Sequence, residues 1–306
     1  MNVLEKISTE LKLDYGYISH IAEHSSFYYK DYTIPKRNGT TRRVSQPSPE
    51  LKTLQYWILH NILAKLPVSN AAYAYKKGDS IKKHALLHSK SRFILHADIR
   101  NFFPSIRSSM LNAVLTESRK VLDDLGLDFD ESLADIRKIC FRKDALCIGA
   151  VSSPAISNVV MYAFDIAMLN YCKANGYIYS RYADDIYISA KSYIHISVLN
   201  VLRDELAKYG FHLNTSKTRF CSSKTCRKVT GLVITNNSQV SIGSERRNEI
   251  KRMIYNKLIH GNGDTDQILG YLSFLKDVEP QTYNNLIIKY SQYCDGDLIK
   301  ALSTNS

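Results

Sequence analysis

The sequence predicts an α+β fold, because segments with helical and with extended patterns alternate along the chain. Apolar residues recur every three to four positions near the N-terminus, where Val3, Ile7 and Leu11 share one stripe, and again towards the C-terminus. Two short apolar strands flank a tight turn at 182–185, and another apolar strand ends at Asp98. Strands interspersed with helices in one chain are typical of this class.

Length and charge narrow the classes of function. The chain has 306 residues, 44% of them hydrophobic, which is enough for one large or two ordinary domains with a substantial core. It carries 41 Lys and Arg against 29 Asp and Glu, a net charge of +12. Such an excess indicates a polyanionic partner, most often nucleic acid.

Targeting and membrane segments are not expected. Glu5 lies where a signal peptide needs its apolar core, so secretion is not predicted. The longest apolar stretch, 156–169, is interrupted by Asn158 and Asp165 and is shorter than the roughly 20 residues of a membrane span. The six cysteines form no C-x-x-C pair, so we expect reduced thiols in a cytoplasmic protein.

The individual elements follow from local patterns. A β-hairpin is predicted around the turn Pro35 to Gly39, where Asn38-Gly39 favours positive φ. Pro154 suits a first helical turn, so one long helix is predicted from there to about Ala174. The acidic segment Asp123 to Asp135 is expected to be a turn-rich surface insertion. The other predicted elements are extended pieces at 28–34 and 41–45, helices over 50–66, before Tyr209 and after an N-cap at Ser244, and strands over 92–98, 177–181, 186–190, 218–221 and 229–235.

The adjacent carboxylates Asp184 and Asp185 are the most informative residues. A hairpin tip forces them into one small volume, where they repel each other unless a cation neutralises them. Asp98 ends another apolar strand, as it would if it converged on the same place. Carboxylate oxygens are the ligands that Mg²⁺ prefers, and three aspartates can hold two ions about 3.5–4 Å apart for phosphoryl transfer. An aspartate pair alone is also a common turn former, so the flanking residues decide.

Three motifs resemble those of reverse transcriptases. The tetrad Tyr182-Ala183-Asp184-Asp185 after an apolar strand resembles motif C. The segment 96–106, with Asp98 and Phe103, resembles motif A, and the segment 149–158 resembles motif B. The resemblance implies a right-hand polymerase with an antiparallel palm sheet covered by helices. Fingers and palm would occupy residues 1–235, and a helical thumb would occupy residues 236–306.

A finer resemblance, from about residue 28 to the end, is to bacterial retron reverse transcriptases. Lys228-Val229-Thr230-Gly231 resembles their V-T-G element. The segment 73–88, which ends in His84-Ala-Leu-Leu-His88, resembles their N-A-x-x-H region. The segment 42–47 resembles their R-x-I-x-x-P fingers element.

Two positions depart from this pattern. His84 stands where the retron element has asparagine, and Ile148 stands where motif B usually has a glutamine that approaches the incoming nucleotide. A zinc site at His84 and His88 is not expected, because residue 85 is alanine where H-E-x-x-H requires glutamate. A structural or RNA-contacting role is expected for both histidines.

The resemblance assigns the metal site and an acid. Asp98, Asp184 and Asp185, with the backbone carbonyl of Ile99, would bind two Mg²⁺ ions, for which Mn²⁺ could substitute. Lys217 matches the motif D lysine that protonates pyrophosphate, although a lone lysine is often only solvated.

The resemblance also assigns residues to the nucleotide and the primer. Phe103 would lie beneath the sugar and exclude a 2′-hydroxyl, and Gly149 would line the nucleotide site. Arg42, or as second choice Arg43, would clamp the triphosphate, because guanidinium matches phosphate in a fork geometry. Tyr182 would pack near the primer terminus. The alternative for each is an ordinary core or surface residue.

The positive charge is concentrated near the C-terminal third. Residues 217–257 hold ten basic and two acidic residues, which leaves +8 of the chain's +12 in this segment. Arg247 and Lys251 lie one helical turn apart, off the apolar stripe of Ile250 and Ile254. Together with residues 228–231, they are predicted to grip nucleic acid with salt-sensitive affinity. A solvated helix face is the alternative.

The predicted activity is RNA-directed DNA synthesis from dNTPs. By resemblance to retron enzymes, the chain would copy a cognate structured non-coding RNA, primed from its 2′-hydroxyl, into branched multicopy single-stranded DNA. An effector protein in anti-phage defence is an expected partner, and a membrane is not. The alternatives are a reverse transcriptase of group II introns or diversity-generating elements, or an RNA-binding scaffold in a defence complex. An RNA-dependent RNA polymerase is not favoured, because those enzymes usually carry Gly-Asp-Asp.

Overall fold

A computed structural model describes residues 1–35, 39–294 and 296–304. Contacts divide the chain into two compact units. The first comprises Met1–Lys77, His96–Ile188 and His195–Arg219, and the second comprises Gly78–Leu95, Ser189–Ile194 and the residues from Phe220 onward. The mixture of helices, small sheets and C-terminal helices confirms the α+β prediction.

The first unit begins with helices and a two-stranded sheet. Its elements to that point are α1 (Val3–Leu11), α2 (Tyr15–Glu23), the 3₁₀ turn η1 (Ser25–Phe27), β1 (Tyr29–Pro35) and β2 (Thr41–Pro47). Strands β1 and β2 pair antiparallel, from Tyr29 opposite Pro47 to Pro35 opposite Thr41. This pairing confirms the predicted hairpin, although Asn38 in its turn lies outside the described residues.

A layer of helices follows in the first unit. It contains α3 (Pro49–Asn61), η2 (Leu63–Lys65), α5 (Phe102–Ser105), α6 (Ser108–Glu117), α7 (Lys120–Asp123) and α8 (Phe129–Cys140). Helix α8 corrects the prediction of a surface insertion over 123–135. Asp128 caps the helix by accepting a hydrogen bond from the Glu131 N–H, and Phe129, Ile136 and Ile139 are buried. The acidic residues therefore begin an amphipathic helix.

The long helix predicted from Pro154 is two helices. Helix α9 (Ser153–Val160) and helix α10 (Tyr162–Ala174) meet at Met161 with a bend of 48°. Ser157 Oγ donates to the carbonyl of Pro154 at 2.8 Å, a local bond that bends helices. No single helix in the described part of the chain is both long and apolar enough to cross a bilayer; α9 and α10 meet that criterion only jointly, across their bend.

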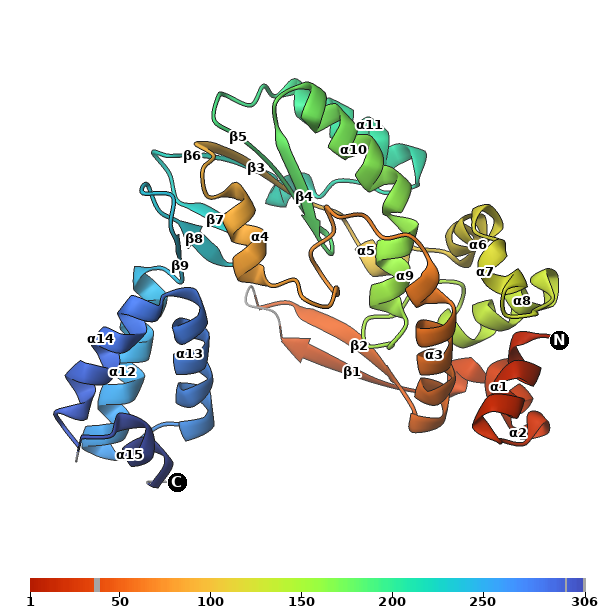
Figure 1. The fold of residues 1–306 in the computed structure, drawn as a ribbon, viewed down its shortest axis with the longest axis horizontal. Helices are drawn as coiled ribbons and strands as arrows, with labels where there is room; N and C mark the ends of the chain where they lie inside the picture. The colour runs from red at the N-terminus through yellow and green to blue at the C-terminus, as the bar shows by residue number, and fades with distance from the viewer. Residues whose placement is uncertain (36–38, 295, 305–306) are drawn as a thin grey trace. The chain divides into compact units, whose positions relative to one another are not determined.

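A four-stranded sheet carries the predicted carboxylates. Its order is β4-β5-β3-β6, formed by β4 (Ile178–Tyr182), β5 (Asp185–Ala190), β3 (Phe93–Asp98) and β6 (Arg219–Ser222). Helix α10 packs against β4 and against α11 (Ser197–Lys208), as Figure 1 shows in green and teal. The 3₁₀ turn η3 (Thr215–Lys217) leads into β6. Side chains of β4 and β5 such as Tyr179, Ile186 and Ile188 are buried, so the strand ends are held on a packed core.

The second unit combines a helix, a small sheet and four C-terminal helices. Helix α4 (Ile81–His88) packs on the antiparallel sheet β7-β8-β9, whose strands are Arg227–Val229, Leu232–Ile234 and Val240–Ser241. The single strand predicted over 229–235 is thus a hairpin, because Thr230 and Gly231 both take positive φ (46° and 85°) and reverse the chain. The helices drawn in blue in Figure 1 are α12 (Ser244–His260), α13 (Thr265–Val278), α14 (Pro280–Ser291) and α15 (Leu298–Thr304).

The start of α12 differs by one position from the prediction. Gly243 is the N-cap residue, with φ 87°, and Ser244 is the first helical residue. Glycine can take this backbone conformation without strain, and no side chain caps the helix. The sequence pattern therefore located the helix but not its capping residue.

Candidate active site

The structure brings Asp98 and the turn at 183–184 together at neighbouring strand ends. Strand β3 ends at Asp98, β5 begins at Asp185, and these strands are neighbours in the sheet. The backbone N–H of Ile99 donates to the carbonyl of Asp184 at 2.9 Å, which joins the end of β3 to the turn. The predicted convergence of these carboxylates thus has a direct structural basis.

The turn itself is fixed by a buried arginine. Ala183 has φ 56°, a left-handed conformation that is uncommon for a residue with a side chain. Arg181, which is fully buried, donates from Nη1 to the carbonyl of Ala183 at 3.1 Å. It forms two further bonds to Asp165, from Nη2 at 2.7 Å and from Nε at 2.9 Å. The turn before Asp184 is therefore held by side chains of the core.

The same network includes the ends of two helices. Tyr179 donates its hydroxyl to Asp165 at 2.7 Å, and burial together with the Asp165 carboxylate raises the pKa of Tyr179. Asn158 on α9 accepts from Arg181 at 3.3 Å and donates to the carbonyl of Ala74 at 2.8 Å. Sequence reasoning missed Arg181. The available signal was a charged residue within a strand expected to be buried, and an aspartate within an apolar helix to pair with it.

The electrostatics of the carboxylates fit a cation site. The pKa of Asp184 is raised, first by burial and then by the carboxylates of Asp185 and Asp98, while Lys217 acts in the opposite direction. Uncompensated negative charge is what a divalent cation would neutralise, and carboxylate oxygens are suitable ligands. The donor set of carboxylate oxygens therefore fits Mg²⁺.

The carboxylates are engaged by protein groups in this conformation. Lys217 Nζ lies 2.7 Å from Asp98 Oδ2, and this bond raises the pKa of Lys217. His96 Nε2 lies 2.7 Å from Asp185 Oδ1. Among the described residues, no three His, Cys, Asp or Glu side chains are arranged as a ready metal site. In this conformation Lys217 is thus bonded to Asp98, and His96 is bonded to Asp185, at oxygens that a metal ion would otherwise contact.

A cleft of about 750 Å³ in the first unit is lined by most of the residues predicted to bind metal ions or the nucleotide. Asp98, Ile99 and Asp184 lie along it together with Arg42, Arg43, Phe103, Gly149 and Lys217. Asp185 and Tyr182 do not line it. Tyr75, which the sequence patterns did not single out, lines the cleft with its ring centroid 6.4 Å from that of Phe103.

Gly149 allows a close approach between the motif B loop and β2. A Cβ at this position would lie 2.8 Å from the carbonyl oxygen of Ser45 and 2.8 Å from Val44 Cγ1, and the φ of Gly149 is +110°. The neighbouring Ile148 carbonyl accepts from the Ser45 N–H at 2.8 Å. The loop therefore packs directly on the strand, and only glycine fits there.

The motif B loop is also bonded to Gln55 of α3. This fully buried side chain accepts from the Val151 N–H at 3.1 Å and donates to the carbonyl of Ile139 and the hydroxyl of Tyr29, both at 3.0 Å. Gln55 was not predicted as a site residue, because a polar residue in an amphipathic helix pattern gives no sign of its partners. The glutamine that motif B lacks at Ile148 is not replaced by Gln55, since the Gln55 side chain is itself fully buried and is bonded to Tyr29, Ile139 and Val151.

The arginines of β2 point to different neighbours. Successive side chains of a strand point to opposite faces, so Arg42 shares a face with Val44, and Arg43 shares a face with Ser45. The charge of Arg42 lowers the pKa of Tyr75, although burial and Asp184 raise it overall. Arg43 instead donates to Asp31 at 2.8 Å. Both arginines line the cleft, but the Arg43 guanidinium is bonded to Asp31, so Arg42 is the better candidate for binding a ligand in the cleft.

The predicted nucleic-acid contacts of the second unit lie on one hairpin and one helix. Lys228 and Gly231 are exposed, whereas the Val229 side chain is buried, so Val229 can offer only its backbone. On α12, Lys251 is half-buried, and Arg247 pairs with Glu279 at 3.4 Å.

The two histidines of α4 are buried and structural. Thr230 Oγ1 lies 3.3 Å from His84 Nδ1, and His88 Nδ1 lies 2.7 Å from Ser189 Oγ. Burial and the neighbouring His84 lower the pKa of His88 to about 3. Because neither side chain is accessible, the structural alternative holds over RNA contact.

Known proteins resemble this chain in sequence and in fold. The family described as "Reverse transcriptase (RNA-dependent DNA polymerase)" matches residues 34–234. The Retron Ec86 reverse transcriptase of Escherichia coli is 31% identical over 296 residues, covering 95% of this chain and 89% of the relative. The Retron Ec73 reverse transcriptase of the same species is 31% identical over 305 residues, covering 95% and 96%.

A solved structure shares the fold. Apo telomerase from Candida tropicalis superposes with a TM-score of 0.51 at 12% sequence identity, over 90% of this chain and 61% of the telomerase chain. At this identity the likeness concerns the fold alone, and the chain spans about three-fifths of the telomerase it matches.

Proposed function

The chain belongs to the retron reverse transcriptases and is an RNA-directed DNA polymerase, and on that premise we propose that Asp98, Asp184 and Asp185 form its catalytic site. The observation that carries this assignment is the bond from the Ile99 N–H to the Asp184 carbonyl, which fixes the end of β3 against the turn of motif C within one cleft.

The three aspartates and the carbonyl of Ile99 would hold two Mg²⁺ ions or Mn²⁺ in their place. The chemistry that such ions supply when bound is a lowered pKa at the attacking hydroxyl and neutralised charge on the departing pyrophosphate. The raised pKa of Asp184 supports this assignment, because burial and then the neighbouring carboxylates of Asp185 and Asp98 disfavour its charged form, which a bound cation would stabilise.

Other cleft residues would bind the nucleotide. Arg42 would hold triphosphate oxygens through its guanidinium, and Gly149 would let the motif B loop approach the base pair. Phe103 would lie under the sugar, where its ring excludes a 2′-hydroxyl. Lys217 would carry a proton at Nζ to the pyrophosphate, since its raised pKa keeps it protonated. Tyr182 would pack at the primer terminus, on the strand that leads into the motif C turn.

We further assign the duplex contacts and the domains. Residues 1–235 would form fingers and palm, and residues 236–306 the thumb. Lys228, Thr230 and Gly231 of the β7–β8 hairpin, the backbone of Val229, and the basic residues Arg247 and Lys251 of α12 would contact nucleic acid. Such contacts to phosphates position the strand without reading its sequence.

The substrate proposal follows from the retron relatives. A cognate structured RNA would provide the template and, through a 2′-hydroxyl, the primer. The product would be branched RNA–DNA, that is, multicopy single-stranded DNA. An effector protein would associate with this complex in anti-phage defence.

The function is tested by DNA synthesis on an RNA template with dNTPs or rNTPs. Replacing Asp184 and Asp185 by Asn should lower the rate at least ~10³-fold, because charge stabilisation at a metal site is worth several kcal/mol. RNA affinity, measured by filter binding, should change less than about 2-fold, as expected when phosphate contacts elsewhere dominate binding. Retained synthesis in the double variant would refute the assignment. Binding without synthesis by the unaltered chain would favour the scaffold alternative.

A further inference from the structure

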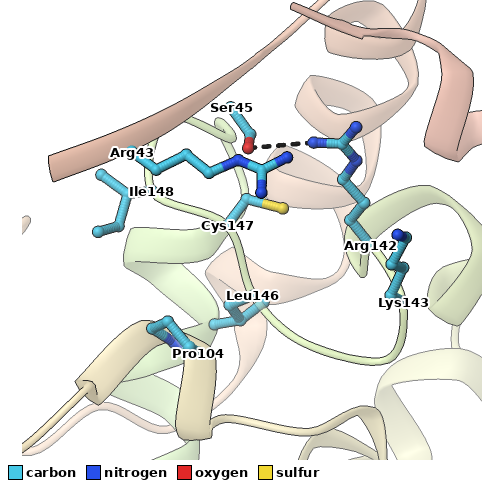
Figure 2. Close-up of a pocket in the computed structure, with 8 residues that line it drawn as sticks. All are labelled: Arg43, Ser45, Pro104, Arg142, Lys143, Leu146, Cys147 and Ile148. Carbon is cyan, nitrogen blue, oxygen red and sulfur yellow. Dashed lines mark hydrogen bonds between the residues drawn. The ribbon is translucent and has the colours of Figure 1, made fainter. Parts of the chain in front are cut away.

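A second pocket lies beside the cleft, with Arg43 of β2 lining both. It has a volume of about 240 Å³ and is lined by Arg43, Ser45, Pro104, Arg142, Lys143, Leu146, Cys147 and Ile148. Figure 2 shows the side chains of Arg43, Arg142 and Lys143 around it. It shares four residues with the cleft, but none of the three aspartates and not Lys217 line it.

The charge of this pocket is positive. Asp31 accepts from Arg43 at 2.8 Å and from Arg142 at 2.7 Å, and these bonds hold the pKa of Asp31 well below its usual range. One carboxylate therefore opposes three cations. The Lys143 ammonium has no hydrogen-bond or ion-pair partner in the described part of the chain, and its side chain is exposed. Burial raises the pKa of the Cys147 thiol to about 11, so it adds no negative charge near neutral pH.

Arg142 is held in place and has donors left over. Its Nη1 donates to Asp31 and, at 3.1 Å, to Ser45 Oγ, the bond drawn dashed in Figure 2. Its guanidinium carbon lies 5.0 Å from the centroid of the Tyr29 ring. Its Nε is buried and has no hydrogen-bond partner among the residues that the structure describes. A guanidinium offers five N–H donors in a fixed fork, so this group is ordered and only partly satisfied.

These features select a phosphate as the ligand. Guanidinium and ammonium groups around one small cavity are the usual receptors for phosphate oxygens. The cavity is smaller than the 300–1,000 Å³ typical of sites for whole drug-sized ligands, so it suits a single phosphodiester group. The triphosphate of the reacting nucleotide is not the best candidate, because its oxygens must meet the aspartates, and those residues lie outside this pocket.

We propose that Arg43, Arg142 and Lys143 bind a backbone phosphate of the unpaired template strand, on the 5′ side of the templating base. The inference rests on the polymerase function proposed above, since only a templated enzyme has such a strand. Because the contact is to a phosphate, it positions the incoming template without sequence preference. Arg42 and Arg43, adjacent in β2, would then bind different ligands. Arg42 would bind the triphosphate of the incoming nucleotide, and Arg43 would bind the template strand.

The test compares primed templates whose 5′ overhang is one or six nucleotides long. Affinity is measured by fluorescence anisotropy without dNTP, for the unaltered chain, Lys143→Ala and Lys143→Glu. We expect Lys143→Ala to weaken binding of the long overhang by about 5-fold more than that of the short one, and to reduce the salt slope by about 1. Lys143→Glu should have a larger effect in the same direction. Lys173→Ala, which alters another exposed lysine of the first unit on α10, is the matched control and should bind like the unaltered chain.

Each other outcome has a defined meaning. Equal weakening on both substrates, or none on either, would overturn the proposal. A higher KM for dNTP without an overhang-dependent loss would also overturn it and place the triphosphate in this pocket. Failure of the polymerase function is seen separately, as absent extension by the unaltered chain on the same substrates, and it does not change the ratio of the two affinities.

Discussion

The ammonium of Lys217 lies 2.7 Å from Oδ2 of Asp98, a residue 119 positions earlier in the chain. Lys217 is therefore bonded to a carboxylate oxygen that Asp98 would need in order to bind a metal ion. A cation bound to Asp98 and the ammonium of Lys217 would compete for the same oxygen, so the lysine would be displaced when the site fills. Displacement would send a protonated amine into the cleft that Lys217 also lines.

Removal of this amine should separate metal binding from catalysis. For Lys217→Met we expect the half-saturating Mg²⁺ concentration to fall about 3-fold, since a nearby positive charge is lost. The maximal rate should fall about 100-fold, the usual contribution of a general acid. Steady-state synthesis over a Mg²⁺ titration measures both, and Lys217→Arg, which keeps the charge, should leave the Mg²⁺ requirement near that of the unaltered chain. An unchanged Mg²⁺ dependence in Lys217→Met would contradict the competition.

The buried pair of Arg181 and Asp165 should matter for both folding and rate. Arg181→Met leaves the Asp165 carboxylate buried without its partner, which should lower the free energy of unfolding by about 3–5 kcal/mol. The double variant with Asp165→Asn removes that charge and keeps an acceptor for Tyr179, so it should recover much of the loss in urea unfolding.

The rate should not recover with the stability. Ala183 would still lack the donor that fixes the turn before Asp184, so kcat of the double variant should stay at least about 10-fold low at unchanged KM for dNTP. A double variant with full activity would show that Arg181 serves stability alone.

Stability should decrease in mild acid because of His88. Its pKa is about 3 in the folded chain against 6.5 in the unfolded chain, so the unfolded state binds the additional proton between these values. The contribution is complete above pH 6.5 and is lost as pH falls towards 3. Between pH 6.5 and 4.5 we expect about 2 kcal/mol to be lost. Urea unfolding of His88→Gln should show a shallower pH slope, whereas His60→Gln, an exposed histidine on α3, should keep the original slope.

Sugar selection should depend on Phe103. If its ring excludes the 2′-hydroxyl, Phe103→Val should lower the preference for dNTP over rNTP by about 10- to 100-fold, the range that steric exclusion in a pocket supplies. The ratio of kcat/KM for matched dNTP and rNTP on one RNA template measures it. Phe103→Tyr retains the bulk and should keep the preference. An unchanged ratio in Phe103→Val would show that another group guards the sugar.

Local patterns predicted most of the regular elements of the fold. The β1–β2 hairpin, the strand ending at Asp98 and the strands around the motif C turn follow from turn residues and apolar alternation. The bend at Met161 did not follow, because it depends on a hydrogen bond of Ser157 that competes with the helical pattern. Helix α8 was missed because its acidic first turn, which suits a helix N-terminus, also suits a loop.

The candidate site shows the same division. The aspartates could be singled out only with the motifs around them, since an adjacent aspartate pair alone is also a common turn former. Lys217 was assigned to the site by resemblance, but its bond to Asp98 was not predicted, and neither were the bonds of His96 to Asp185 and of Arg181 to the turn at Ala183, because such tertiary contacts leave no periodic pattern in the sequence. The two arginines of β2 could be told apart only when the strand register and Asp31 were known.

The lack of space for a Cβ atom at Gly149 limits which substitutions this position can accept. Every amino acid that one base change can reach from a glycine codon carries a Cβ, and here that atom would lie 2.8 Å from a backbone oxygen of β2, which cannot rotate away. Any single substitution of Gly149 would therefore clash with β2 unless the strand first shifts. A substitution at Gly149 would require the backbone around Ser45 to shift at the same time. Laboratory evolution of nucleotide preference should therefore yield substitutions at Ile148 and not at Gly149.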